Sequence, residues 1–188
     1  MRLNLVFRVS IEISVFSSFA QRCDWVFQGH HPGDDSSPEE LAWSTPGGVG
    51  VHLVDDMVLG FTYLVMENDS IPDVPDVYVR NTRREVAAGF DVVESSEVVE
   101  LYWGAPEWNS KVLLLMMLAA AASEYSSDIF NVVKDGLASN NSDVRRAALI
   151  ASMYTPWDSL RESVESIARS ESDEQLRDLA EMALMNFD

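Results

Sequence analysis

The chain has 188 residues, 47% of them apolar, so it is long enough to bury a core without disulfide bonds. It carries 31 acidic and 13 basic side chains, and the resulting net charge of −18 repels nucleic acids and anionic lipids. The acidity is global, because residues 1–104 sum to 6 − 17 = −11 and the remaining residues sum to 7 − 14 = −7. This negative charge favours a basic protein as partner. The alternative is that it only keeps the protein soluble.

Compartment signals favour the cytoplasm. Cys23 is the only cysteine, so no intrachain disulfide can form and a reducing environment fits. Arg8 and Glu12 interrupt the apolar N-terminal run, which argues against a secretion signal. The most apolar segment, residues 112–122, is too short to cross a bilayer. We expect a cytoplasmic protein without a membrane span.

In the first half, apolar and polar residues alternate with a period of two, which predicts mainly strands. Residues 3–15 read as a long strand or hairpin, and residues 98–103 alternate in the same way. The other elements expected are a turn-rich loop at 29–48 with a short helix from 37 to 43, a hairpin of strands 50–54 and 57–67, a short strand at 77–79 and a short helix at 83–92.

The second half changes to a helical period of about 3.6. Five helices are expected, at 110–124, 127–138, 142–154, 157–170 and 173–186. Good N-caps, Ser110, Ser142 and Ser172 or Asp173, support the helix starts. Ser110 and Ser142 are 142 − 110 = 32 residues apart, and a fixed spacing of this size is typical of stacked helical hairpins.

The repeated helices resemble the second helix of HEAT repeats. The segment that carries the likeness begins Ser142-Asp143-Val144-Arg145, and Arg177 follows Arg145 at the same spacing. The resemblance implies that Asp143, Arg145 and Arg177 are structural residues that tie neighbouring repeats together. The first unit departs from the pattern, because Lys111 and Leu113 stand at the matching positions. An ordinary helical bundle is the alternative.

The expected fold class is therefore α+β. We predict an N-terminal, mostly β unit over residues 1–106, and a C-terminal HEAT-like stack of helices over residues 107–188. We expect the two to pack as one compact body.

No catalytic motif stands out. His30 and His31 are adjacent in a loop and lack the helical spacing of two metal ligands. Cys23 and His52 could pair as nucleophile and base, but no oxyanion signature surrounds the cysteine, so a packed thiol is the better interpretation. The glycines of residues 47–50 resemble a phosphate loop in composition only. We predict no enzyme, metal or cofactor.

Acidic residues around the predicted hairpin are candidates for contacts with a basic partner. Asp55 and Asp56 lie in its turn, and Glu67 and Asp69 follow its second strand. Such carboxylates form an anionic surface that can meet lysine and arginine. Calcium binding is disfavoured, because the regular oxygen spacing of a calcium loop is missing.

Aromatic residues at the expected junction of the halves are further candidates. Trp103 and Trp108 bracket the turn at residues 104–107, next to acidic residues. Aromatic anchors beside charges are typical of interface hot spots. The alternative is that these tryptophans seal the two halves together.

The sequence as a whole resembles a bacterial immunity protein in general character, being small, acidic and partly built from helical repeats. The resemblance implies a non-catalytic protein that binds a cognate, basic toxin and covers its active surface. Two alternatives stay open. One is an enzyme or small-molecule binder with a site between the halves that uses His52, Tyr63 or Asp55, and the other is an adaptor subunit that holds a peptide in the repeat groove.

Overall fold

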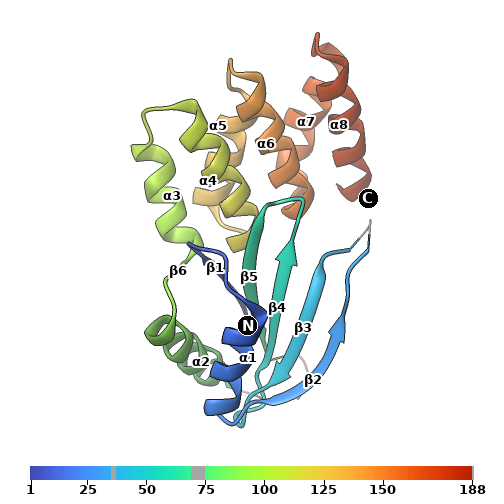
Figure 1. The fold of residues 1–188 in the computed structure, drawn as a ribbon. Coiled ribbons are helices and arrows are strands. Elements are labelled where there is room, and N and C mark those ends of the chain that lie inside the picture. Colours follow the sequence, from blue (N-terminus) through green and yellow to red (C-terminus); the bar gives the residue numbers. More distant parts are fainter. Residues whose placement is uncertain (35–36, 69–74, 188) are drawn as a thin grey trace. The chain divides into compact units, whose positions relative to one another are not determined.

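The computed structural model describes residues 1–34, 37–68 and 75–187, and the chain divides into two compact units, Met1–Glu94 and Ser95–Asp188 (Figure 1). The first unit holds a β-sheet and the second is a stack of helices, so the α+β class is confirmed. The division falls between residues 94 and 95 rather than 106 and 107. Residues 95–104 belong to the second unit because they form a helix that packs on the helices after it.

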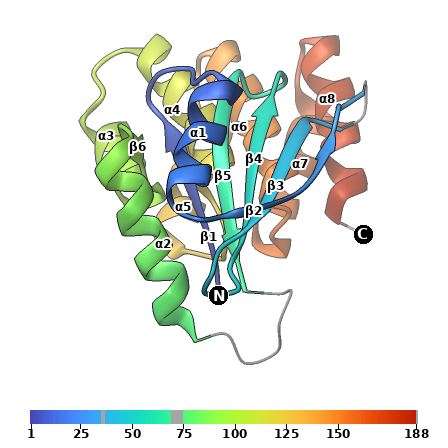
Figure 2. The same ribbon diagram turned by 60° about the horizontal axis from the view of Figure 1, so that its bottom comes forward.

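The first unit is built on one antiparallel sheet of six strands in the order β2-β3-β4-β5-β1-β6. Its strands are β1 (Arg2–Phe7), β2 (Val26–His31), β3 (Glu39–Ser44), β4 (Gly50–Asp56), β5 (Phe61–Glu67) and β6 (Val92–Val93). Helices α1 (Ile13–Arg22) and α2 (Asp76–Gly89) lie over the same face of this sheet (Figure 2).

The core of the first unit lies between that face and the two helices. Alternate residues of β1, β3, β4 and β5 point into it, because successive side chains of a strand face opposite sides. The helices contribute residues at helical spacing. The buried cluster comprises Leu5, Phe7, Leu41, Trp43, Val49, Val51, Leu53, Leu64 and Met66 from the strands and their ends, and Phe16, Phe19, Ala20, Trp25, Val79 and Val86 from the helices and the residue leading into β2.

The predicted strand over residues 3–15 is only half right. Strand β1 ends at Phe7, and Glu12 precedes helix α1 in an extended conformation. Helix α1 forms because Phe16, Phe19 and Ala20, spaced i, i+3 and i+4, all become buried on one side. This burial outweighs the apparent alternation of Ile11, Ile13 and Val15.

Three other local predictions are wrong. Residues 37–43 lie largely in strand β3, because pairing with β2 and β4 outweighs the local helix-start signal at Ser37. Residues 77–79 open helix α2, with Pro75 at its N-cap, and residues 98–103 lie within helix α3. The expected helix at 83–92 is the second half of α2, which ends at Gly89.

The β4–β5 hairpin is confirmed, with a turn fixed by its own polar groups. The Asp56 carbonyl accepts a hydrogen bond from Gly60 N at 2.8 Å. Gly60 has a φ of +73°, a conformation that glycine adopts without the steric cost other residues incur.

The second unit is a stack of three helical hairpins, α3–α4, α5–α6 and α7–α8 (Figure 1). Helices α4, α6 and α8 pack side by side, and α3, α5 and α7 do the same. The helices are α3 (Ser95–Gly104), α4 (Trp108–Ala121), α5 (Ser127–Leu137), α6 (Ser142–Tyr154), α7 (Asp158–Ser170) and α8 (Glu174–Leu184), followed by a 3-10 turn, Met185–Phe187.

All five predicted helices are confirmed, with shifts of a few residues at their ends. The predicted caps are partly right. Asp173 caps α8, whereas Asn141 rather than Ser142 caps α6. Ser110 lies inside α4, because that helix begins earlier, after Glu107.

The repeat spacing appears in the buried positions of both helices of each hairpin. In the second helices Ala119, Ala151 and Ala183 are buried at the spacing seen in the sequence. In the first helices Val98, Ile129 and Leu160 are buried at an equal spacing of their own, since 129 − 98 = 160 − 129. The stack is therefore compatible with helical repeats, and α3 belongs to it.

Candidate functional site

The two aspartates at the end of β4 differ in their surroundings. Asp55 is exposed and accepts a hydrogen bond from Thr62 Oγ1 at 3.1 Å. Asp56 is only 2% exposed, and its Oδ1 accepts from the backbone N–H groups of Val58 and Leu59 at 2.9 and 3.0 Å. The Asp56 carboxylate thus holds the turn together, contrary to the expectation that it lies at the surface.

Glu67 lies at the opposite end of the hairpin from these aspartates. Phe61 pairs with Asp56, so six steps along β5, about 20 Å at 3.4 Å per residue, separate the two ends. Asp69 lies outside the described residues. The candidate carboxylates at Asp55, Asp56 and Glu67 therefore do not gather into one anionic surface.

Two residues of the alternative enzyme site have neighbours as partners: Asp55 accepts from Thr62, and His52 lies beside two glutamates. His52 Nδ1 lies 2.7 Å from Glu40 Oε1, and its Nε2 lies 3.6 Å from Glu67 Oε1. Burial, aided by the negative charge of Asp56, raises the pKa of Tyr63 to about 12, so this phenol stays protonated at neutral pH. Both ring nitrogens of His52 thus lie near carboxylates, Glu40 on β3 and Glu67 on β5.

The two candidate tryptophans lie within the second unit, on either side of the α3–α4 turn. Trp103 is 53% exposed and Trp108, the first residue of α4, is 49% exposed. Partly exposed indoles of this kind are apolar surface that can contact a partner. The acidic residues Glu100 and Glu107 nearby are exposed as well.

A third exposed apolar residue, in α4, is assigned to this region by comparison with the next hairpin. Leu113 is 54% exposed and lies at 145 − 32 = 113, the position of Arg145 in the next hairpin. Arg145 reaches the carbonyl of Ser139, two residues after the end of α5. By this equivalence we expect Leu113 beside the turn that follows α3. We call Trp103, Trp108 and Leu113 the tryptophan corner.

A polar cluster fixes the helices that carry this corner. Tyr102 is buried, and its hydroxyl donates to Asp135 Oδ2 at 2.7 Å. Lys111 Nζ donates to the same oxygen at 3.1 Å and lies 4.6 Å from the centre of the Tyr102 ring. Burial and the bond to Asp135 raise the pKa of Tyr102. The cluster joins α3, α4 and α5, and the Trp103 ring packs edge-on against Tyr102 with centroids 5.3 Å apart.

The arginines with a predicted structural role make equivalent contacts in the second and third hairpins. Arg145 Nη1 donates to the Ser139 carbonyl at 2.9 Å and Arg177 Nη1 to the Glu171 carbonyl at 2.7 Å, each six residues upstream. Arg145 also pairs with the Glu171 carboxylate at 2.8 Å, which links the two hairpins. Asp143 is exposed in the first turn of α6, so the acid that joins neighbouring hairpins is Glu171.

Glu171 is a residue that the sequence interpretation missed. Hydrogen bonds from the backbone N–H of Asp173, together with the Arg145 guanidinium, lower the pKa of this carboxyl. The signal that could have found it is its place just before the cap Asp173, at the position equivalent to Ser139 in the preceding hairpin.

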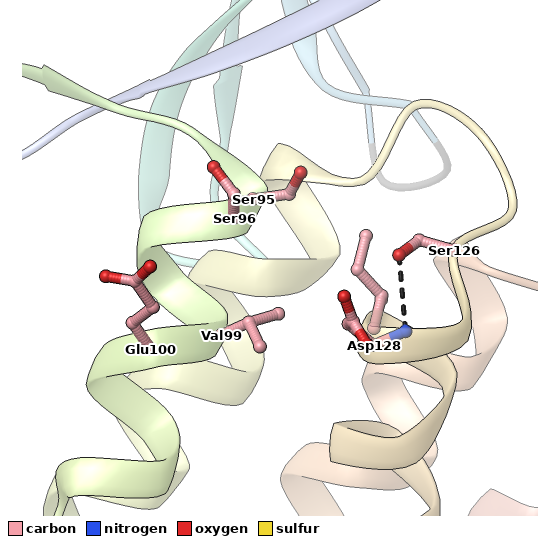
Figure 3. Close-up of a pocket in the computed structure, with 7 residues that line it drawn as sticks. Ser95, Ser96, Val99, Glu100, Ser126 and Asp128 are labelled. Atoms are coloured by element: carbon pink, nitrogen blue, oxygen red, sulfur yellow. Dashed lines mark hydrogen bonds between the residues drawn. The ribbon is translucent and has the colours of Figure 1, made fainter.

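A cavity of about 200 Å³ lies within the second unit where α3 and α5 begin (Figure 3). Val99 and Asp128 point into the space between the two helices, whereas the Glu100 carboxylate points away from α5. Ser126 Oγ accepts a hydrogen bond from Asp128 N at 3.3 Å. The lining residues are Ser95, Ser96, Val99, Glu100, Ser126, Asp128 and Ile129.

The other candidates for chemistry have structural partners. Burial raises the pKa of the Cys23 thiol, and the side chain packs against the core of the first unit. Across residues 1–34, 37–68 and 75–187, no three His, Cys, Asp or Glu side chains are placed to share a metal ion. Nor does that part of the chain contain a helix of the length and apolarity that a bilayer crossing requires.

No protein-family model, curated protein or solved structure matches this chain. The HEAT-like character is therefore a resemblance in helix pairing and spacing. What the fold and the site define is a stack of helical hairpins, joined in one chain to an antiparallel sheet unit, with an exposed aromatic corner on its first hairpin.

Proposed function

We propose that this chain is a non-catalytic binding protein of the immunity type, which neutralises a basic protein toxin by covering its active surface. The observation that carries the proposal is the tryptophan corner. Two half-exposed tryptophans lie within 108 − 103 = 5 residues of each other, in a chain of net charge −18. Buried tryptophans at the centre of an interface are the commonest hot-spot residues.

Covering the corner supplies enough free energy to matter. A tryptophan side chain offers about 200 Å², so roughly half of that remains accessible on each indole. At about 25 cal/mol per Å², covering both contributes roughly 5 kcal/mol before the costs of association. The cluster of Tyr102, Lys111 and Asp135 holds the corner in place, which lowers the entropy lost on binding.

Charge supplies the second part of the proposal. A net charge of −18 accelerates encounter with a basic protein and repels acidic ones. Part of this negative charge lies close to the corner in sequence, on the exposed carboxylates of Glu100 and Glu107. Association should therefore slow at high salt, while dissociation, controlled by the buried aromatic contacts, changes less.

The size of this cavity suits a side chain of a protein partner better than a whole cofactor or drug-sized ligand. Pockets that enclose a cofactor or a drug-sized ligand usually measure about 300–1,000 Å³. The cavity at the start of α3 and α5 holds about 200 Å³.

The test is a pull-down from the native cell lysate with the full chain as bait, at low and high salt, read by mass spectrometry. We expect one stoichiometric basic protein, captured more strongly at low salt. An empty bait at both salts would contradict the proposal.

Matched variants assign the capture to the corner. The double change Trp103→Ala and Trp108→Ala should abolish it, and Tyr125→Ala, which removes a comparably exposed aromatic ring of the same unit, should not. Co-expression of the captured protein with and without this chain then tests neutralisation. A captured protein that is harmless alone would rule out the immunity role.

A further inference from the structure

The cavity at the starts of α3 and α5 has the dimensions of one side chain. Its volume of about 200 Å³ equals roughly seven water molecules at about 30 Å³ each. It lies on the first two hairpins of the second unit, of which the first carries the tryptophan corner. A single residue of a protein partner fits this space better than a metabolite does.

The lining combines two acids, Asp128 and Glu100, with several hydroxyls and two apolar side chains. The Asp128 carboxylate lies on the side of α5 that faces α3, and Val99 points toward it from α3 (Figure 3). The hydroxyls of Ser95, Ser96 and Ser126 add neutral acceptors, and Ile129 is buried beneath. Arginine matches this combination, because its apolar stem can lie on Val99 while its planar head offers five donors.

An anion is the competing occupant, because the N-terminal ends of helices attract negative charge. Here both helices already have an acid in the first turn, Glu97 in α3 and Asp128 in α5. The net charge of −18 opposes an anion further. A cation is therefore favoured. Arginine is favoured over lysine, because several acceptors spread over the wall suit a fork of donors better than a compact, strongly hydrated ammonium.

The cavity and the tryptophan corner lie along the same helix. Val99 and Trp103 are four residues apart in α3, which places them on one face about 6 Å apart along the axis. One segment of a partner can therefore fill the cavity and cover Trp103. We infer that this cavity receives an arginine side chain of the basic partner, next to the apolar contact between that partner and the tryptophan corner. This inference rests on the proposed function.

The experiment titrates the full, isotope-labelled chain with N-acetyl-L-argininamide and follows backbone amides by NMR. We expect saturable shifts at Ser96, Val99 and Asp128, with half-saturation at roughly 10 mM, as suits a ligand of this size. Asp128→Asn should weaken binding about fivefold. Asp143→Asn is the matched control, an exposed first-turn acid of α6 that removes the same charge, and should leave the titration unchanged.

Four results would overturn the inference: shifts that do not saturate, equal weakening by the two variants, equal affinity for N-acetyl-L-lysinamide, or a larger saturable response to inorganic phosphate. The spectrum of each variant away from the cavity confirms its fold. The pull-down separates the two proposals. A captured basic partner with no response to the arginine probe refutes the cavity alone, and a specific probe response with an empty bait refutes the immunity role alone.

Discussion

The second and third hairpins of the helical unit differ from the first in how they use corresponding positions. In α5–α6 and α7–α8, Asn141 and Asp173 cap the second helix, and Arg145 and Arg177 hold the preceding turn. In α3–α4 the matching positions hold Asn109, which lies inside α4, and the exposed Leu113. At the position of Arg145 and Arg177 the regular hairpins thus use a polar side chain in structure, whereas the first hairpin exposes an apolar one.

That difference teaches where a surface for binding can arise. Clusters of exposed apolar side chains cost solubility and mark interaction sites, so the departure of the first hairpin from the repeat is where we place the proposed binding surface.

The largest effect is expected at Gly136, where the second hairpin approaches the first. A methyl group there would lie 2.8 Å from Ala148 Cβ and 3.0 Å from Leu115 Cδ1. Gly136→Ala should therefore lower the free energy of unfolding by about 1–3 kcal/mol, as overpacked cores do. The control is Gly104→Ala at the end of α3, where a methyl group meets open space and stability should not fall. Urea unfolding measures both, and equal results would show that the approach of α5 to its neighbours is not tight.

The next effect tests Leu113 directly. Leu113→Arg restores the residue of the other two hairpins and places a cation in the tryptophan corner. Partner affinity should fall about tenfold, because a desolvated like charge now faces a basic protein. Stability should stay within about 0.5 kcal/mol, since the position is exposed. Binding kinetics with the captured partner measure the affinity, and thermal unfolding measures the stability. Unchanged affinity would remove Leu113 from the corner.

A smaller effect separates the caps of the first and second hairpins. Asn141→Ala removes a side chain that accepts from the N–H groups of Asp143 and Val144, and should cost about 1 kcal/mol of stability. Asn109→Ala, the equivalent change in α4, should cost less than about 0.5 kcal/mol, because that residue lies within the helix. Equal losses in urea unfolding would mean that the first hairpin is capped like the others.

The smallest effect concerns pH and the link between the second and third hairpins. The folded state lowers the pKa of Glu171 from its ordinary value of 4.5, so its stabilisation is present above that value and is lost as pH falls through the folded-state pKa. Glu171→Gln should thus be less stable than the wild type at about pH 6, with a smaller difference at about pH 3.5. Glu165→Gln, which removes a largely exposed pair with Arg169, should change little at either pH.

The helices were predictable from sequence because their stabilising features are local. Caps, turns and the helical period lie within one segment, and the constant spacing of the repeated segments is visible along the chain. Helix α3 was not predicted because residues 98–103 are rich in β-branched and aromatic side chains, which favour strands. Only its packing on α4 and α5 selects the buried pair Val98 and Tyr102.

The first unit was harder to predict, because its elements depend on partners far along the chain. Residues 39–44 become a strand only by pairing with β2 and β4, and α1 forms because its phenylalanines meet the sheet. The candidate site shows the same contrast between local signals and contacts made far along the chain. Trp103 and Trp108 were candidates from their sequence context, whereas the cavity and Glu171 arise from residues on different helices that only the fold brings together.

The contacts that repeat between the second and third hairpins make this stack extensible. A tandem copy of residues 127–157 inserted after residue 157 would carry its own cap Asn141 and its own contact of Arg145 with the Ser139 carbonyl. Only the copy next to the third hairpin would meet Glu171, because Ser139 stands at the equivalent position within the copied residues. The tryptophan corner, confined to the first hairpin, would stay single. Lengthening the protein by whole hairpins would therefore add stability and surface while leaving the number of binding corners at one.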